Sequence, residues 1–428
     1  MKLNKAKLYS TSSASCLNND KVKRALKIEI ITHSYPPDFG AAPLLFEDLA
    51  DFLLQQGCDV EVLTAMPYYP IGVIPEGYRK QLFVREERKG VTVRRHWLYP
   101  SNLSSKRSKR FAGMISMSLT MLRSLPHLLR RNPDILFIQT PPMMTPLLFL
   151  LCKRLIRGKV ILNISDLWPE AIVDLGLMQD KGWVYHNLKK LQSWMYRRAD
   201  ALVAQSNGIK QHLEKEGRSI DLIYRVGVDT RLFQPKEYRD ITENKPFRLV
   251  YTGVLNVAHG IVSLCQQINF KSLGAELHIY GDGAKSKELK EFLKENPDRG
   301  IVLHEVVSLK AIAELLPTYD AALISQRRVI RGTLPAKVYE SMAAGLPIVF
   351  SGGGEAADII EEHQCGYVSH PQNIEQLKEH IQELAQQGPE ALAEMGQNGR
   401  VAALEHYDRR GQHKQLYAFF EGVFREKK

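Results

Sequence analysis

A strand, a polar loop, a short helix, a tight turn and a second strand follow one another between residues 319 and 350. The first strand is the apolar run 319–325, and Pro335 suits the first turn of the helix, where its missing N–H has no partner to lose. Gly345 and Pro347 end the helix before the next apolar run. Because successive strands joined by a helix are typically parallel, this stretch predicts one βαβ unit.

Lys337 and Glu340 lie three residues apart in the predicted helix, so both side chains project from one face. The N-terminus of a helix has unpaired N–H groups and positive dipole charge, and a lysine there adds to a binding site for phosphate. A carboxylate one turn further along can accept hydrogen bonds from two neighbouring ribose hydroxyls. The pair indicates a clamp for a nucleoside diphosphate. The alternative is a solvated helical pair that contributes about 0.3 kcal/mol.

A glycine-rich turn follows the second strand and consists of Gly352, Gly353 and Gly354, with Glu355 opening another predicted helix. Backbone N–H groups in such a turn can approach an anion closely, so two anion-binding turns follow successive strands. The run also fits the G-x-G-x-x-A pattern of dinucleotide oxidoreductases. It lies at the wrong end of the chain for their first βαβ unit, and the diphosphate interpretation is therefore favoured.

Strand-like and helical runs alternate through both halves of the chain. The alternation predicts an α/β protein with two doubly wound, Rossmann-like domains that face each other across a cleft. We place the first domain at 27–233, a polar linker at 234–246 and the second domain at 247–405. A C-terminal helix at 406–428 is expected to pack back toward the first domain. Ligands of such folds bind beyond the carboxyl ends of the strands, so the site is expected between the domains.

The length of 428 residues, with 44% hydrophobic and 25% charged, is ordinary for a globular protein of two or three domains. The five cysteines are widely spread, which indicates neither a disulfide framework nor a zinc site and fits a reducing cytosol. Residues 1–26 lack the apolar core of a signal peptide, and we expect a disordered tail. The apolar runs 111–125 and 141–156 are too short or too interrupted to cross a bilayer.

The net charge of +11 is concentrated in residues 79–131, where fourteen Lys and Arg face only two Glu. The basic cluster 104–110 precedes an apolar helical run, which is the composition of a segment that lies on an anionic membrane surface. We therefore expect a cytoplasmic protein attached peripherally to the inner face of the cell membrane. The alternative is a solvated basic face beside a core helix. Nucleic acid is not expected as a partner because no base-reading motif occurs.

Eight short motifs, in register, resemble glycosyltransferase family 4, and within it the bacterial polysaccharide branch of colanic acid or fucosamine-type transferases. The motifs are at 33–43, 67–70, 165–171, 227–229, 251–253, 280–283, 335–340 and 354–357. This resemblance implies a GT-B fold, a nucleotide-sugar donor held by the second domain, and transfer with retention of configuration and without a metal or other cofactor. The chain has no D-x-D pair, as expected for an enzyme without a metal.

By this resemblance, residues of the second domain bind the donor. The predicted donor residues are Lys337, Glu340, Gly281, Gly283, Gly352, Gly353, Gly354 and Glu355. The chain departs from the family pattern at three positions. The first glutamate of the E-x7-E motif falls at Gly332, and the donor-site arginine and lysine fall at Val254 and His259. Arg327, Arg328 and Arg331 are candidates to replace the missing cations.

In the first domain, Gly40 and Ala41 close the first strand-to-helix turn, which the family brings near the donor phosphates and the acceptor. Asp166 follows an apolar strand and could orient or deprotonate an acceptor hydroxyl. Its alternative role is an N-cap before Pro169. His33, also at a strand end, is the second catalytic candidate, against a purely structural histidine.

The expected function is transfer of a sugar from a nucleoside diphosphate, UDP as the first candidate, to a lipid-linked saccharide in the biosynthesis of a cell-surface polysaccharide such as capsule or O-antigen. An N-acetylated amino sugar or a deoxy sugar is the candidate donor sugar. The departures at Gly332, Val254 and His259 leave an alternative, a non-catalytic subunit that binds sugar nucleotides.

Overall fold

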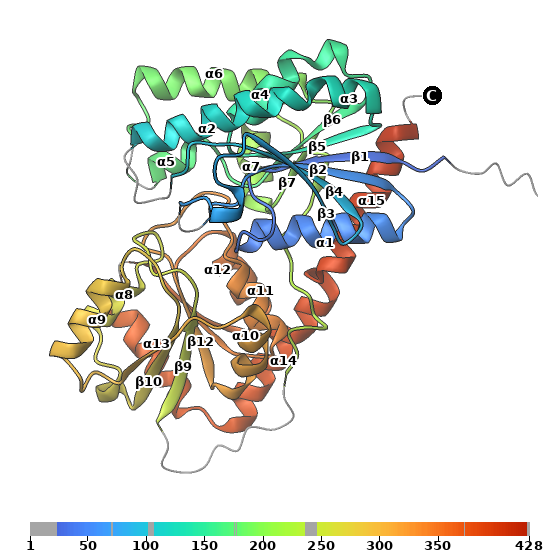
Figure 1. The fold of residues 1–428 in the computed structure, drawn as a ribbon. Coiled ribbons are helices and arrows are strands. Elements are labelled where there is room, and N and C mark those ends of the chain that lie inside the picture. Colours follow the sequence, from blue (N-terminus) through green and yellow to red (C-terminus); the bar gives the residue numbers. More distant parts are fainter. Residues whose placement is uncertain are drawn as a thin grey trace, which may run out of the picture.

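The computed structural model describes residues 24–69, 72–101, 107–174, 176, 178–235, 246–371 and 373–425, and only the backbone of residues 107, 108 and 110. The expected tail lies outside these residues up to residue 23, and so does the stretch 236–245 of the expected linker. Figure 1 shows two α/β units, each with a sheet flanked by helices. The predicted α/β class with two doubly wound sheets is confirmed.

The first sheet is parallel except at one edge. Its strands are β1 (Lys27–Ile31), β2 (Asp59–Ala65), β3 (Phe83–Arg88), β4 (Val91–His96), β5 (Ile135–Thr140), β6 (Lys159–Ile164), β7 (Ala201–Ala204) and β8 (Leu222–Ile223). They are ordered β3-β4-β2-β1-β5-β6-β7-β8, and only β3 and β4 pair antiparallel. All six residues of β5 are buried, as expected for a parallel strand covered on both faces.

The second sheet is parallel throughout. Its strands are β9 (Phe247–Thr252), β10 (Ala275–Tyr280), β11 (Ile301–His304), β12 (Ala321–Ser325), β13 (Ile348–Ser351) and β14 (Gly366–Ser369). The order is β11-β10-β9-β12-β13-β14. The βαβ unit predicted at 319–350 is present, with β12 and β13 adjacent and parallel.

Helices cover both faces of both sheets. They are α1 (Ala41–Gln55), α2 (Arg107–Met121), α3 (Leu125–Arg131), α4 (Met144–Leu151), α5 (Glu170–Asp174), α6 (Trp183–Arg198), α7 (Asn207–Lys215), α8 (Ile261–Gln267), α9 (Ser286–Glu295), α10 (Leu309–Leu315), α11 (Ala336–Ala343), α12 (Glu355–Glu362), α13 (Ile374–Gln386), α14 (Pro389–His406) and α15 (Arg409–Arg425). One face of the first sheet packs on α2, α3, α4, α6 and α7, and the other on α1 and α15. The second sheet lies between α10, α11, α12 and α14 on one side and α8, α9 and α13 on the other.

The chain passes between the two units twice, and the two passages lie side by side. Val228 pairs with Asp408 in a parallel bridge, in which the Val228 N–H donates to the Tyr407 carbonyl at 3.0 Å and the Arg409 N–H to the Val228 carbonyl at 2.9 Å. After the second passage α15 runs along the first unit beside α1 (Figure 1). Its buried Phe420 stacks edge-on against Phe137 of β5, with ring centroids 5.2 Å apart. The last helix is thus part of the first hydrophobic core.

Fewer basic side chains of the region 79–131 are available to a partner than its composition indicates. It contains the β3–β4 hairpin, and five of its basic side chains form ion pairs with carboxylates. The pairs are Arg88 and Lys89 with Glu47, Arg94 with Glu61, Arg95 with Glu86, and Arg131 with Glu29, Asp59 and Glu61. Much of the excess charge therefore holds the first sheet together and is not free for a partner. Within the described residues, every helix is too short or too polar to cross a membrane.

Candidate active site

Loops at the carboxyl ends of the two sheets meet in a set of direct contacts, which we call the domain junction. The junction joins the segment 166–208, with Arg225, to the segment 328–333 and Glu355. α11 and α12 lie on the side of the second unit that is nearest to α1 and the first sheet (Figure 1). Two of the predicted site residues, Asp166 and Glu355, take part in this junction.

Lys337 lies in the first turn of α11 and points back toward the end of β9. Its Nζ lies 3.3 Å from the Tyr251 hydroxyl and 4.3 Å from the centre of that ring. Gly253 leaves room for it, because a Cβ at that position would lie 2.3 Å from Nζ. Burial lowers the pKa of Lys337 to about 8, and the nearby Glu340 acts in the opposite direction. Since no described carboxylate forms an ion pair with it, Lys337 can bind an anionic ligand.

Glu340 lies one turn further along α11 and is half-buried. Burial raises the pKa of its carboxyl group, while Lys337 and Arg409 act to lower it. Its carboxylate makes no hydrogen bond within the described residues, which is unusual for a largely desolvated charge. The predicted clamp therefore exists as two adjacent, opposite and unpaired charges on one helix face. Donor binding by the pair remains a prediction.

The predicted donor glycines Gly281 and Gly283 allow two loops to touch through their backbones. A Cβ on Gly281 would lie 1.9 Å from the Gly253 carbonyl, and a Cβ on Gly283 would lie 2.5 Å from that of Leu255. The loops after β9 and β10 are tied by the hydrogen bond from the Leu255 N–H to the Asp282 carbonyl at 2.9 Å. Gly281 and Gly283 thus allow the close contact between the two loops, one of which contains Gly253 beside Lys337.

The glycine turn after β13 offers fewer free N–H groups than the sequence suggests. The N–H of Gly352 donates to the Ser369 carbonyl at 2.9 Å and so continues the sheet. The N–H groups of Gly353 and Gly354 have no acceptor within the described part of the chain, and they are the ones that can face a phosphate.

Glu355 connects the two domains. One oxygen accepts from Arg225 at 2.9 Å, and the other accepts from the Gly208 N–H at the start of α7 at 2.8 Å. Its side chain is 7% exposed. Both oxygens already have protein partners, so the predicted role of Glu355 in donor binding has no support from its contacts.

Gly332, where the family pattern has a glutamate, is pressed against the first domain. Its φ is +74°, and a Cβ would lie 2.5 Å from Cγ1 of Ile209 in α7. The Ser206 hydroxyl, which caps α7, donates to the Gly332 carbonyl at 2.7 Å. A glutamate could not stand here without moving the junction, so the sequence departure has a structural reason.

The candidates to replace the missing cations differ in their surroundings. The Arg331 guanidinium pairs with Asp174 of α5 at 2.7 Å, and Arg328 approaches the Asp174 carbonyl at 3.5 Å. These two arginines hold the domains together. Burial, and secondarily Lys337, lowers the pKa of His259 to about 4, so that histidine is neutral. Arg327 is the one of the three arginines whose only described hydrogen bond is through its backbone, to Ala258.

Asp166 also takes part in the junction. Its Oδ1 accepts a hydrogen bond from the Thr333 hydroxyl at 2.9 Å, across the two domains. Burial raises its pKa to about 6, against the lowering effect of the Thr333 bond. It makes no hydrogen bond to the α5 backbone within the described residues, so nothing supports the N-cap alternative.

His33 follows β1 and contacts β5. Its Nδ1 lies 3.1 Å from the side-chain oxygen of Gln139, and burial lowers its pKa to about 4, so the ring is neutral. Gly40 precedes α1 with φ +139°, and a Cβ there would lie 3.3 Å from the Tyr69 ring, while Ala41 begins the helix. The first strand-to-helix turn therefore has the predicted geometry.

Two polar residues near these loops escaped the sequence analysis. Asp38 accepts from the N–H groups of Tyr68 and Tyr69 at 2.8 and 2.9 Å and joins two loops of the first domain. Burial raises its pKa to about 6. Gln139 lies inside an apolar strand, where a glutamine gives no signal of its contacts. Only the motif around Asp38, two residues before Gly40, could have pointed to it.

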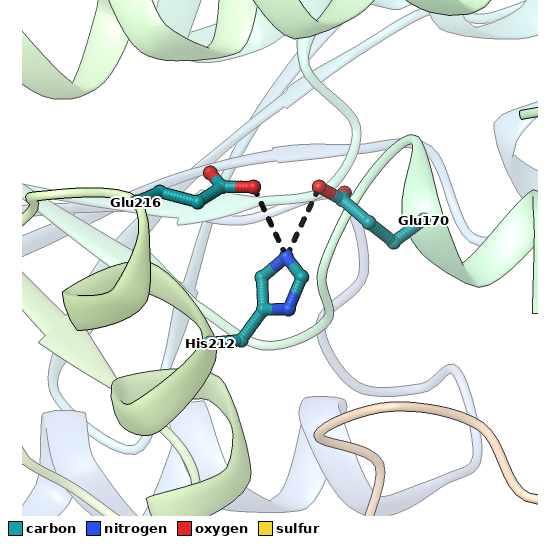
Figure 2. Close-up of side chains that lie close together, drawn as sticks. All are labelled: Glu170, His212 and Glu216. Atoms are coloured by element: carbon teal, nitrogen blue, oxygen red, sulfur yellow. Dashed lines mark hydrogen bonds and ion pairs between the residues drawn. The ribbon is translucent and has the colours of Figure 1, made fainter. Parts of the chain in front are cut away.

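Glu170, His212 and Glu216 are close enough to hold a metal ion. Figure 2 shows the two carboxylates on either side of the His212 ring, with Nε2 3.4 and 3.3 Å from them. The Lys189 ammonium, however, already bonds both carboxylates. Burial raises the pKa of Glu170, but its bonds to His212 and Lys189 outweigh burial and lower it to about 2. The Lys189 ammonium thus provides the positive charge that a metal ion would provide, and we assign no metal to this cluster.

Two family models match the chain, one in each half. The model described as glycosyl transferase 4-like domain matches residues 44–226, and the model described as glycosyl transferases group 1 matches residues 236–402. The glycosyltransferase WbjE of Pseudomonas aeruginosa is 26% identical over 268 residues, which span 60% of this chain and 67% of that protein. The colanic acid biosynthesis glycosyl transferase WcaI of Escherichia coli is 24% identical over 343 residues, 75% of this chain and 82% of that protein.

Solved structures resemble both units together. Sucrose-phosphate synthase from Thermosynechococcus elongatus aligns with a TM-score of 0.73 at 14% identity, over 94% of this chain and 100% of that chain. HepE of Anabaena in complex with UDP-glucose aligns with a TM-score of 0.66 at 14% identity, over 93% of this chain and 100% of that chain. The predicted GT-B arrangement of the two domains is thereby confirmed.

Proposed function

Since the chain belongs to the glycosyltransferases, with a glycosyl transferase 4-like domain followed by a glycosyl transferase group 1 domain, we propose that it transfers a sugar from a nucleoside diphosphate to a lipid-linked saccharide. In the proposed reaction the configuration is retained and no metal takes part. UDP is the proposed nucleotide, and an N-acetylated amino sugar or a deoxy sugar is the sugar that we propose is transferred. The proposed process is the synthesis of a cell-surface polysaccharide, as the name of WcaI states for that relative.

The observation that carries this proposal is the unpaired Lys337 and Glu340 on one face of α11, beside the domain junction. The lysine would bind the diphosphate together with the N–H groups of Gly353 and Gly354, and the glutamate would accept the two ribose hydroxyls. As the bond between the sugar and the diphosphate breaks, negative charge develops on the diphosphate. Fixed cations and N–H dipoles that face this charge lower the barrier, which supports a reaction without a metal.

On the other side of the junction, Asp166 would accept the hydrogen bond of the acceptor hydroxyl before the reaction, and His33 would accept one from a neighbouring hydroxyl, so that the reacting oxygen is oriented. This oxygen bonds to the anomeric carbon on the face from which the diphosphate departs, so the configuration is retained. The electron pair of the broken bond stays with the diphosphate, and the hydroxyl proton passes to a diphosphate oxygen. Of the three departures that motivate the alternative of a non-catalytic subunit, the one at Gly332 is explained by packing on α7.

Binding and turnover together test the proposal. We expect one of the UDP-, GDP- and dTDP-sugars to raise the melting temperature, since a ligand at 100 times its Kd stabilises the fold by about 2.7 kcal/mol. We further expect mass spectrometry to show a sugar added to a lipid-pyrophosphate saccharide in the presence of EDTA. Binding without a product would favour the non-catalytic subunit, and a strict need for a divalent ion would contradict the metal-free reaction.

We also propose that the start of α2 attaches the protein to the inner face of the membrane. α2 lies on the outside of the first unit together with α4 and α6 (Figure 1). Phe111 and Leu119 of α2 are 52% and 56% exposed, and Trp183 at the start of α6 is 80% exposed. Apolar side chains beside a basic cluster are typical of surfaces that bind anionic lipid.

Replacing Lys106 and Lys109 by alanine is expected to weaken binding to phosphatidylglycerol vesicles about thirtyfold, because each basic residue near such a surface contributes about 1 kcal/mol. Co-sedimentation at low salt measures this. Alanine at Lys287 and Lys290, on α9 of the other domain, is the control with the same change in net charge. If the unmodified protein stays in the supernatant, or both double variants lose binding equally, α2 is not the attachment site.

A further inference from the structure

The side-chain amide of Gln139 contacts the loops after two neighbouring strands. Gln139 is the last residue but one of β5 and is 3% exposed. Its oxygen accepts from the Thr32 hydroxyl at 2.6 Å and lies 3.1 Å from Nδ1 of His33. Its nitrogen donates to the Ser165 hydroxyl at 3.1 Å. One amide thus joins the carboxyl ends of β1, β5 and β6, which are adjacent in the sheet.

The contact with the amide oxygen fixes the tautomer of His33. An amide oxygen can only accept hydrogen bonds, so Nδ1 of His33 must carry the hydrogen. In a neutral imidazole the other nitrogen then has a free lone pair. Among the described residues, the one hydrogen-bond partner of that nitrogen, Nε2, is the Ser34 hydroxyl, at the long distance of 3.4 Å. It is therefore available to accept a hydrogen bond from a substrate hydroxyl.

The other end of the same amide holds the loop that carries Asp166. Ser165 is the residue before Asp166, and it is also bound through its backbone N–H to the Thr140 carbonyl at 2.8 Å. Asp166 in turn receives the Thr333 hydroxyl of the second domain. Gln139 is thus the one side chain, among the described residues, that contacts both His33 and the segment before Asp166.

We propose that Gln139 is a positioning residue that holds His33 as the Nδ1–H tautomer and sets its Nε2 and the Asp166 carboxylate to accept hydrogen bonds from neighbouring hydroxyls of the acceptor sugar. This inference rests on the proposed function and adds a residue to it. The competing explanation is a glutamine that merely satisfies buried polar groups. Asn163 offers a comparison at equal burial: it is the register partner of Gln139 on β6, is 0% exposed, and has no described hydrogen-bond partner for either amide atom.

Two substitutions separate the two explanations. In Gln139→Leu both contacts are lost, and kcat is expected to fall ten- to hundredfold, the order of loss that follows a small misplacement of a reacting group. The KM for the donor should stay within about twofold, because Lys337 and Glu340 are untouched. Asn163→Leu is the control at equal burial in the same row, and its kcat should stay within about twofold of the unmodified enzyme.

Gln139→Glu keeps the shape and the acceptor but places a negative charge beside His33. An opposite charge this close raises a histidine pKa by about one unit or more. His33 accepts the substrate hydrogen bond only when neutral, so activity falls as pH drops through its pKa. Asp166, whose pKa burial raises to about 6, already gives kcat an acid limb, so a raised His33 pKa should make that limb steeper and extend it to higher pH in this variant. A merely structural glutamine would change stability and leave that limb where it is.

A readout without turnover keeps the test independent of the proposed function. Nitrogen NMR of protein with labelled histidines, assigned by a His33→Gln variant among the 13 histidines, reports the tautomer and pKa of His33 directly. We expect a neutral Nδ1–H ring, a raised pKa in Gln139→Glu and a mixture of tautomers in Gln139→Leu. An Nε2–H ring, or signals unchanged in both variants, would overturn the inference. Failure to find any transfer activity would instead refute the proposed function.

Discussion

Replacing Lys337 by methionine is expected to lower kcat/KM for the donor by about 10²- to 10³-fold, the loss typical when one group that stabilises developing negative charge is removed. Methionine keeps most of the apolar length of the lysine and loses the ammonium that lies over the Tyr251 ring, so the fold should persist. Steady-state kinetics with the donor identified by the screen measures the effect. Methionine at Lys290, on α9, is the control, and its kcat/KM should stay within about twofold.

The pH dependence of donor binding gives a second readout of Lys337. Its pKa is lowered to about 8, first by burial, so the ammonium form that binds phosphate is lost as pH rises through about 8. Donor affinity should therefore decline between about pH 7 and 9 in the unmodified protein, and this decline should be absent in Lys337→Met. A bound diphosphate will itself raise the lysine pKa, so the decline belongs to the free enzyme. Equal affinities of the two proteins across this range would remove Lys337 from the donor site.

Glu340→Ala is expected to cost about 1.5 to 3 kcal/mol of donor affinity, because the ribose loses hydrogen bonds to a charged acceptor. Glu340→Gln, which still offers one oxygen, should lose less. Calorimetric titration with the donor measures both Kd values. Glu361→Ala, at an exposed position in the last turn of α12, is the control. A Kd that stays the same in Glu340→Ala would contradict the ribose contact.

The same substitution should not weaken the fold, which separates lost binding from lost structure. Burial raises the pKa of Glu340 above its unfolded value, so the ionised carboxylate opposes folding at neutral pH, and that cost shrinks as pH falls. Glu340→Ala removes the cost. Its melting temperature without ligand is therefore expected to equal or exceed that of the unmodified protein at pH 7, and differential scanning calorimetry checks this.

Local pattern predicted most strands because the central ones are apolar on both faces. β6 has the same bounds in the sequence and in the structure, Lys159–Ile164. The β3–β4 hairpin was missed for the opposite reason. β3 reads FVREER, with the charges of an exposed segment, and its place at the edge of the sheet needs few buried side chains.

The site residues also fall into two groups, those that a local sequence pattern predicts and those that it does not. Lys337 and Glu340 are three residues apart on one helix, so their spacing alone placed them together. The partners of Glu355 and Arg331 lie 130 and 157 residues away in the chain, in Arg225 and Asp174. A contact of that kind depends on how two domains meet, which no local pattern records. The ties made by Glu355, Arg328 and Arg331 therefore became visible only in the structure.

The two segments that connect the lobes are paired with each other at Val228 and Asp408. They therefore form one hydrogen-bonded connection and not two independent linkers. Any rotation of one lobe relative to the other has to bend both connecting segments at the same point, which restricts translation of the lobes. A chain cut before α15 would forfeit Leu416 and Phe420 from the amino-terminal lobe as well. The amino-terminal lobe therefore depends on a helix from the end of the chain, and the two connecting segments are held together at one hydrogen-bonded point.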